Sequence, residues 1–464
     1  MTKTTIWAAS AAAAVLLAGC EKAKQTSGGT GGGDGTVKLI TLDPGHFHAA
    51  LVQKRMYPDV SPTVHVYAPE GNDLKMHMDR INSFNTRADQ PTKWESKIYT
   101  GPDFLEKMLK DKAGNVVVLA GNNARKTEYI LKSVQAGYNV LADKPMAITP
   151  KDFELLKQAF ETAKQKGVLL YDIMTERHEI TTLLQRELSR FPKVYGTQEK
   201  GTPDDPAVTK ESVHHFCKLV AGKPLQRPPW YYDTAQQGEA IVDVNTHLTD
   251  LVQWETFPGV TLSPADVNVV NARVWPTPIT LEQFKTSTSQ GEWPDYLKKS
   301  LDANNVLQCR ANGEFTYALK GVYAKVSVLW NFQPPAGAGD THFSLMRGTR
   351  SSLIIQQGEA EGYKPALYVE PRRGTGVKPE EIGDALKEAV AEINKTYPGI
   401  GFEKHETGWR INIPASYAIR HEAHFGQVTE AYLGFLKNHN LPAWEVPNML
   451  TKYHTLMEAY KKSR

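Results

Sequence analysis

The chain has 464 residues, too many for one small hydrophobic core, so typical domain sizes predict roughly two or three folded units. Hydrophobic residues make up 41% of the chain and charged residues 23%, which excludes disorder as its general state. The 54 Lys and Arg residues nearly balance the 51 Asp and Glu residues, and the net charge of +3 gives no electrostatic reason to expect a nucleic-acid partner.

The N-terminal segment has the pattern of a bacterial secretion signal. Lys3 precedes an apolar run at 6–17, which is shorter than the roughly 20 residues that a membrane-spanning helix needs. The run ends in Leu-Ala-Gly-Cys at 17–20, which resembles the lipobox where cleavage leaves an acylated cysteine. We therefore expect residues 1–19 to be a lipoprotein signal peptide and Cys20 to carry a lipid that holds the protein at the cell envelope, on the periplasmic or outer-membrane face. An ordinary secretory signal is the alternative.

A glycine-rich stretch at 20–36 follows the signal and predicts a flexible tether, so the folded part is expected to begin near Val37. Two cysteines, Cys217 and Cys309, remain beyond the tether. They could pair in an oxidising envelope, but thiols so far apart in sequence are more often buried singly. The sequence leaves both outcomes open.

Residues 37–190 alternate short apolar runs with amphipathic stretches. The apolar runs are 37–42, 63–67, 116–120, 139–142 and 168–171. Several are nearly continuous and β-branched, as strands covered by helices on both faces would be. The stretches 127–136 and 150–166 have helical spacing, and the second has Pro150 at its start and Gly167 just past its end. The pattern predicts an α/β domain with a doubly wound parallel sheet, whose ligand binds at the carboxyl ends of the strands.

After Phe191 the pattern changes to alternating runs separated by loops rich in Pro and Gly, which predict antiparallel strands. These runs are 266–275, 313–319, 322–330 and 351–356. Helical stretches at 379–397 and 424–437 could pack on that sheet or reach back to the first domain. We expect residues 191–464 to form an α+β domain with a mostly antiparallel, open sheet.

The turn after the first strand, 42–50, contains Gly45, His46 and His48. A dinucleotide fold needs glycines here, so that the backbone can approach a pyrophosphate at the start of a helix. Only Gly45 is present. Taken alone, the turn is better explained as an ordinary tight turn.

Lys144 follows the apolar run 139–142 after one residue, Asp143, and precedes Pro145, which holds it extended at the carboxyl end of a strand. A cation at this edge could stabilise negative charge that develops on a substrate oxygen. A solvated loop lysine is the alternative, and the position makes the two about even.

The segment 236–254 has the spacing of a helix with an apolar stripe. Beside that stripe, Asp243, His247 and Asp250 follow one another at intervals of four and three residues. A carboxylate one turn before a histidine can orient the imidazole and raise its basicity, which predicts a general base. An inert, hydrogen-bonded histidine is the alternative.

Together these motifs resemble the Gfo/Idh/MocA family of oxidoreductases, named for glucose-fructose oxidoreductase, inositol dehydrogenase and rhizopine catabolism. Its members typically have Glu-Lys-Pro where this chain has Asp-Lys-Pro at 143–145. They also carry a glycine-led Asp-x-x-x-His-x-x-Asp on a helix, matched here by Gly238, Asp243, His247 and Asp250. The phrases around 214 and 230 resemble a divergent, lipoprotein-rich branch common in Bacteroidetes.

The resemblance implies that residues 37–190 form a Rossmann-like NAD(P)-binding domain and 191–464 a substrate-binding domain. It also implies an NAD(P)-dependent oxidoreductase that acts on a hydroxyl of a sugar or glycoside. His247 would take the hydroxyl proton, Lys144 would stabilise the alkoxide and help to place the nicotinamide, and Asp243 would orient His247. Because the signal has no twin arginine, the chain would cross the membrane unfolded and could not carry a bound cofactor with it. It would then have to find NAD or NADP outside the cytoplasm and hold it tightly.

Residue by residue, the resemblance gives two further sets. The expected cofactor contacts are Gly45, His46, His48, Glu70 (or Asp73), Asn122, Asn123 and Lys144. The expected substrate contacts are Arg177, Trp230, Tyr231, Asp233 and Asp250. Because the acidic residue that meets the ribose could be either Glu70 or Asp73, the choice between NAD and NADP stays open.

Other functions stay open. A glycosidase that oxidises its sugar transiently would use the same catalytic residues, and a glycan-binding lipoprotein would have kept the fold without the cofactor. A metal hydrolase using His46, His48, His214 and His215 ranks last because the sequence has no clear metal-binding framework, so we predict no metal site. The open sheet of the second domain is compatible with a homo-oligomer.

Overall fold

The structure of the protein is a computed structural model that describes residues 36–220, 223–419 and 421–464. The expected signal peptide, the lipidated Cys20 and nearly all of the tether lie outside the described residues. Val37–Arg464 forms one folded unit. Among the helices that the structure describes, none is both long and apolar enough to cross a membrane.

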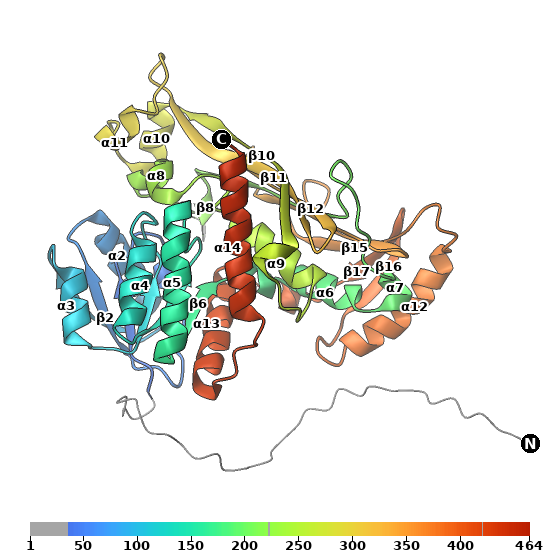
Figure 1. Cartoon of the computed structure of the whole chain (residues 1–464), viewed down its shortest axis with the longest axis horizontal. Helices are drawn as coiled ribbons and strands as arrows, with labels where there is room; N and C mark the ends of the chain where they lie inside the picture. The colour runs from blue at the N-terminus through green and yellow to red at the C-terminus, as the bar shows by residue number, and fades with distance from the viewer. Residues whose placement is uncertain (1–35, 221–222, 420) are drawn as a thin grey trace, which may run out of the picture. The chain divides into compact units, whose positions relative to one another are not determined.

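A six-stranded, all-parallel sheet forms the first part of this unit, as the sequence predicts (Figure 1). Its strand order is β3-β2-β1-β4-β5-β6. The strands are β1 (Leu39–Leu42), β2 (Thr63–Ala68), β3 (Glu95–Thr100), β4 (Val116–Leu119), β5 (Asn139–Asp143) and β6 (Leu170–Ile173). Every residue of β1, β4 and β6 is buried, because these strands are covered on both faces, which explains their continuous apolar runs.

The apolar runs do not predict β3. This strand lies at the edge of the sheet, and its sequence, Glu-Ser-Lys-Ile-Tyr-Thr, is exposed or half-buried throughout. An edge strand pairs on one side only and often carries polar side chains, so hydrophobic patterning gives little sign of it.

Helices connect the strands of the first sheet. They are α1 (His48–Leu51), α2 (Asn72–Thr86), α3 (Phe104–Asp111), α4 (Lys126–Gln135) and α5 (Pro150–Lys166), followed by the 3-10 helix η1 (Thr175–His178), α6 (Ile180–Ser189) and α7 (Pro192–Tyr195). The bounds of α5 are those predicted. Thr149 and Asp152 close its first turn as a capping box, and Gly167 ends it in the left-handed region with φ +66°.

A nine-stranded sheet forms the second part, with the order β10-β11-β12-β7-β13-β14-β15-β17-β16. All neighbours are antiparallel except β12 and β7, which run parallel, so the sheet is mostly antiparallel, as predicted. The strands are β7 (Val208–His215), β10 (Val267–Ile279), β11 (Leu307–Leu319), β12 (Val322–Asn331), β13 (Thr341–Arg347), β14 (Ser351–Gln357), β15 (Ala366–Pro371), β16 (Gly401–His405) and β17 (Gly408–Asn412). A short hairpin, β8 (Leu219–Val220) with β9 (Lys223–Pro224), stands apart.

The helices of the second part are η2 (Pro229–Tyr232), α8 (Thr234–Gln237), α9 (Asn245–Thr256), η3 (Pro264–Asp266), α10 (Leu281–Thr288), α11 (Asp295–Lys298), α12 (Pro379–Ile393), η4 (Ala415–Tyr417), α13 (His421–Asn438) and α14 (Glu445–Lys462). Of the two predicted late helices, α12 stays with α7 and β16, whereas α13 reaches back to α1, η1 and β6. The last helix, α14, packs on α5, α9 and β10 and so joins the two sheets (Figure 1). The predicted division between residues 190 and 191 stays a prediction.

One predicted helix is shorter than expected. The segment 236–254 is not a single helix: α8 ends at Gln237, Gly238 follows with φ +97°, and α9 begins only at Asn245. Helical periodicity missed this break because the intervening residues continue the apolar pattern while the chain turns. Asp243 therefore lies in the turn that leads into α9, and His247 and Asp250 lie on the helix.

Candidate active site

The carboxyl ends of the parallel strands bring together residues from both parts of the chain. Lys144, directly after β5, forms an ion pair with Asp243, whose Oδ1 lies 2.9 Å from the lysine Nζ. Both side chains are at least nine-tenths buried. Asp243 also accepts a hydrogen bond from Gln237 Nε2 at 3.2 Å. Two of the three predicted catalytic residues are thus in direct contact.

His247 lies in the first turn of α9 and is buried. Its Nδ1 is shielded from solvent and has no hydrogen-bond partner among the described residues. Burial and the positive charge of Lys144 lower the pKa of His247 to about 3, so the imidazole is neutral at physiological pH. Asp243 is hydrogen-bonded to Lys144 and Gln237, and the expectation that it orients His247 stays a prediction.

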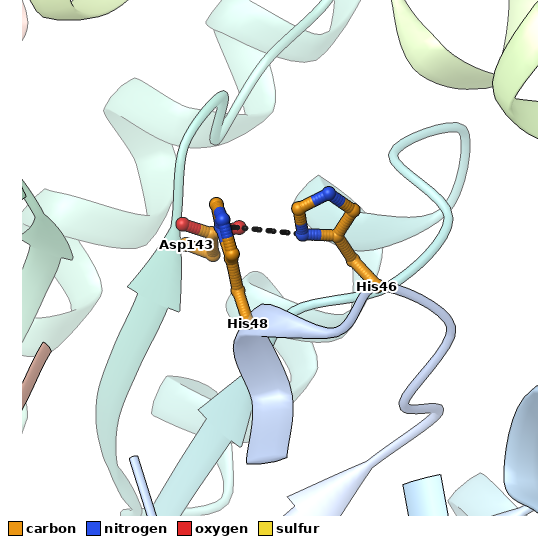
Figure 2. Close-up of side chains that lie close together, drawn as sticks. All are labelled: His46, His48 and Asp143. Carbon is orange, nitrogen blue, oxygen red and sulfur yellow. Dashed lines mark hydrogen bonds and ion pairs between the residues drawn. The ribbon is translucent and has the colours of Figure 1, made fainter. Parts of the chain in front are cut away.

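His46, His48 and Asp143 lie close together (Figure 2). His46 lies in the turn after β1, His48 is the first residue of α1, and Asp143 is the last residue of β5. Oδ2 of Asp143 lies 2.9 Å from Nδ1 of His48 and 3.7 Å from Nδ1 of His46. The sequence placed the histidines in the cofactor set and gave Asp143 no role, because pairing across strands is not visible in a local motif.

Burial lowers the pKa values of both His46 and His48 well below the ordinary value for histidine. After burial, His48 contributes most to lowering the pKa of His46. The pKa of His48 is lowered next by His421 and Lys144. Asp143 opposes the shift of His46 and does not cancel it. Both imidazoles are therefore neutral near pH 7.

Asn122 and Asn123 follow β4 and contact the segment around α8. Asn122 donates a hydrogen bond to Gln236 Oε1 at 2.7 Å, and Asn123 Nδ2 donates to the main-chain oxygen of Gln237 at 2.7 Å. Asn123 Oδ1 is buried and has no partner within the described chain. These amides stand at the predicted place, and their binding of a cofactor stays a prediction.

The turn at Gly45 lies against the side chains of Asp73 and Trp230. A Cβ at Gly45 would stand 2.9 Å from Asp73 Oδ2 and 3.0 Å from Trp230 Cζ2. Trp230 Nε1 donates a hydrogen bond to Asp73 Oδ2 at 2.7 Å, and burial raises the pKa of Asp73 to about 6. Glu70, the other predicted ribose contact, is exposed just after β2.

The other aromatic and acidic residues of the predicted substrate set are also buried. Tyr231 lies parallel to His46, with ring centroids 6.1 Å apart. Asp233 caps α8 by accepting a hydrogen bond from the main-chain nitrogen of Ala235, and it also accepts one from Gln236. Tyr231 therefore lies beside the histidine cluster, and the contact of these residues with a sugar stays a prediction.

Arg177 and Asp250 lie in a network of buried ion pairs. Arg177 makes a two-pronged contact with Asp250, at 2.6 and 2.8 Å, and a second with Glu445 of α14, at 2.9 and 3.1 Å. Lys452, also on α14, bridges Asp250 and Asp172 at 2.8 and 2.6 Å. Every charge in this network has a partner, a pattern typical of a structural ion-pair network, here among β6, η1, α9 and α14. Substrate contact by Arg177 and Asp250 stays a prediction.

Sequence reasoning also missed Glu176 and His421. Nδ1 of His421, at the start of α13, lies 3.2 Å from Glu176 Oε1. Burial pushes the pKa of Glu176 upward, but the hydrogen bond and charge of His421 hold it well below its ordinary value. The His421 ring lies 6.0 Å from that of His48, so this pair borders the same cluster. No local pattern marks α13 as part of the site, because it lies far along the chain.

Both cysteines in the described part of the chain are free. Cys309 is buried and Cys217 is half-buried, so they lie singly, as the sequence favoured.

Two protein families match the chain. Residues 184–464, more than half of its length, match the family described as "Putative oxidoreductase C terminal domain". Residues 66–172 match the family described as "Oxidoreductase family, NAD-binding Rossmann fold". No curated protein matches the chain.

Solved structures share the fold. One from Parabacteroides merdae, described as a "putative oxidoreductase", is 54% identical, with a TM-score of 0.90 over 92% of this chain and 98% of that one. KijD10, a 3-ketoreductase from Actinomadura kijaniata in complex with NADP, is 14% identical, with a TM-score of 0.54 over 92% and 98% of the two chains. A levoglucosan dehydrogenase in complex with NADH and L-sorbose is 11% identical, with a TM-score of 0.57 over the same shares. The last two show the fold alone.

The parallel sheet with a polar carboxyl edge and the matched families define the class: an oxidoreductase with an NAD-binding Rossmann domain. The chain belongs to the Gfo/Idh/MocA oxidoreductase family, as its motifs suggested. Similar structures in this fold hold NAD or NADP.

Proposed function

We propose that the protein is an NAD(P)-dependent oxidoreductase that acts on a hydroxyl of a sugar or glycoside and holds its cofactor tightly. The observation that carries the proposal is the buried Lys144–Asp243 ion pair beside the neutral imidazole of His247. These residues stand at the carboxyl edge of the parallel sheet, where ligands of such folds bind. The names of two structures with the same fold, a 3-ketoreductase and a levoglucosan dehydrogenase, favour a carbohydrate.

Each residue of the trio has a role in this chemistry. The neutral imidazole of His247 accepts the proton of the substrate hydroxyl, and Lys144 Nζ donates a hydrogen bond to the oxygen that becomes negative. Asp243 fixes the position of Lys144 through their 2.9 Å contact. The nicotinamide, when bound, supplies the acceptor or donor of the hydride.

The polar groups at this edge fit a dinucleotide. Asn123 Oδ1 is buried without a partner among the described residues, so a ligand amide or hydroxyl could satisfy it, and Glu70 is exposed at the end of β2, where this fold contacts a ribose. The indole of Trp230 lies against Gly45, in the turn where this fold holds a pyrophosphate. On this proposal the indole and the pyrophosphate compete for the space at Gly45.

The first test is to purify the protein, denature it and identify any released small molecule by mass spectrometry. Near-stoichiometric NAD or NADP supports the proposal, and protein that is empty and also fails to bind added NAD(P) overturns it. Sugars and chromogenic glycosides are then offered with an electron acceptor. Oxidised sugar marks a dehydrogenase, whereas release of the aglycone without net change in cofactor marks a glycosidase.

The proposal extends to location. We propose that Cys20 carries a lipid that anchors the protein to a membrane of the cell envelope, because Leu-Ala-Gly-Cys follows an apolar run of signal-peptide length. Metabolic labelling with a fatty-acid analogue should mark the wild type and not a Cys20→Ala variant. Size-exclusion chromatography of the same preparations tests the homo-oligomer that the open sheet allows.

A further inference from the structure

The histidine cluster has a geometry that the proposed redox chemistry does not use. Two imidazoles, His46 and His48, point their Nδ1 atoms at one carboxylate oxygen, Asp143 Oδ2 (Figure 2). One potential ligand atom from each of the three residues lies within 4.8 Å of the others. His48 and Asp143 are buried, and His46 is largely so.

Hydrogen bonding explains only part of this arrangement. Asp143 accepts one good hydrogen bond, from His48 at 2.9 Å. The 3.7 Å separation from His46 is too long for a second, and His46 Nδ1 is shielded from solvent without a hydrogen-bond partner in the described residues. A buried imidazole nitrogen that faces a carboxylate and remains unsatisfied needs another explanation.

The separations suit a metal ion. Nitrogen and oxygen ligands lie about 2.0–2.2 Å from Zn²⁺, so in a tetrahedral site they are about 3.3–3.6 Å from one another. The observed separations of 2.9 and 3.7 Å bracket this range. Two histidines with one carboxylate form a set that binds divalent first-row transition metals and leaves coordination positions open.

Neighbouring groups position the three possible ligands, and the two nearby lysines bind other acceptors than the Asp143 carboxylate. The His48 ring packs on Phe425 with centroids 4.5 Å apart. The nearby Lys126 donates to the main-chain oxygen of Asp143 rather than to its carboxylate, at 3.0 Å, and Lys144 is engaged by Asp243. Within the described chain, the only basic side chains in contact with the Asp143 carboxylate are the two imidazoles.

We propose that His46, His48 and Asp143 bind a divalent first-row transition-metal ion, with at least one coordination position left for an oxygen ligand. The ion would lie next to Lys144, which directly follows Asp143 in the chain and pairs with Asp243. An oxygen atom of a bound substrate could take the open position and be polarised there. The proposal concerns binding and does not depend on the proposed oxidoreductase activity.

The test measures zinc directly. The full-length protein is dialysed against a chelator, incubated with Zn²⁺, separated from free metal and assayed by elemental mass spectrometry. We expect about one zinc per chain in the wild type. His46→Asn and Asp143→Asn should each lower the affinity for zinc by more than the roughly 10–100-fold loss that follows removal of a group that merely supports a ligand.

The matched control is His65→Asn, since His65 is a half-buried imidazole on β2, hydrogen-bonded to Tyr99 and away from the cluster. It should keep the wild-type zinc content. His46→Asn is the decisive variant, because Nδ1 of His46 has no hydrogen bond to lose within the described part of the chain, so the fold of the variant should survive. Cobalt gives a second signal, since Co²⁺ in the site should show visible absorption bands that His46→Asn abolishes.

Wild-type protein that retains no stoichiometric zinc overturns the proposal. So does zinc that stays bound at wild-type affinity in both cluster variants. If Asp143→Asn fails to fold, the zinc content and cobalt spectrum of His46→Asn decide alone. Because none of these readouts uses NAD(P) or a sugar, a negative result would leave the oxidoreductase proposal standing, and the reverse also holds.

Discussion

His247 and Asp250 lie one turn apart on α9, yet they belong to two different kinds of buried polar cluster. Asp250 is held by Arg177 and Lys452, and the charges of that network are paired throughout. His247 keeps a buried nitrogen without a hydrogen-bond partner among the described residues, and so does His46. Burying an unsatisfied polar atom costs free energy, and a ligand that satisfies the atom recovers that cost. The paired network has the pattern of a structural element, whereas the unsatisfied cluster is the place to look for chemistry.

The largest effect is expected from His247→Asn. Turnover should fall by up to about 10⁴-fold, because a positioned general base is lost. The melting temperature should change little, since Nδ1 of His247 makes no hydrogen bond to the residues that the structure describes. Steady-state kinetics and a thermal melt measure the two quantities on one preparation. Insoluble or unfolded protein would instead place His247 with the structural network.

The second effect concerns the network itself. Asp250→Ala should lower the free energy of unfolding by about 3–5 kcal/mol, because Arg177 and Lys452 both lose a buried counter-charge. Urea unfolding measures this loss. Asp79→Ala, which removes an exposed ion pair with Lys75, is the control and should stay within about 0.5 kcal/mol of wild type. A stable Asp250→Ala variant that has lost affinity for substrate would return Asp250 to the substrate site.

Lys144→Ala tests whether a buried ion pair serves catalysis more than stability. Turnover should fall about 10²–10³-fold, because the cation that stabilises the oxyanion is absent. Stability should fall by less than in Asp250→Ala, since only one ion pair is broken and Asp243 keeps its hydrogen bond from Gln237. The same kinetic and urea assays apply. An unchanged rate would remove Lys144 from the catalytic set.

The smallest effect is expected at Trp230. Trp230→Ala should tighten NAD(P) binding by up to roughly tenfold, because the indole no longer competes for the space at Gly45. Isothermal titration with NAD and with NADP measures this change in affinity and also shows which of the two cofactors the protein prefers. Trp275→Ala, on β10, is the matched control and should bind as wild type does. Weaker binding in Trp230→Ala would mean that the indole stacks on the ligand.

Much of the fold follows from local patterns. The runs that became β1, β4 and β5 are apolar because both faces of a parallel sheet are covered, and α5 carries its own start and stop signals. The edge strand β3 has neither feature, and hydrophobic periodicity carried the predicted helix through the turn before α9. Both β3 and the turn before α9 depend on contacts between residues far apart in the chain, which hydrophobic periodicity does not reveal.

For the site, the sequence by itself determined the family and the three candidate catalytic residues, because Asp-Lys-Pro and Asp-x-x-x-His-x-x-Asp are short, contiguous patterns. Only the tertiary structure decided which charges are paired. Asp143 meets the two histidines because the ends of β1 and β5 share one edge of the sheet, and Glu445 and Lys452 reach Arg177 and Asp250 because α14 returns to that edge. Such contacts depend on the positions of segments that are distant in the chain, and local sequence patterns do not encode these positions.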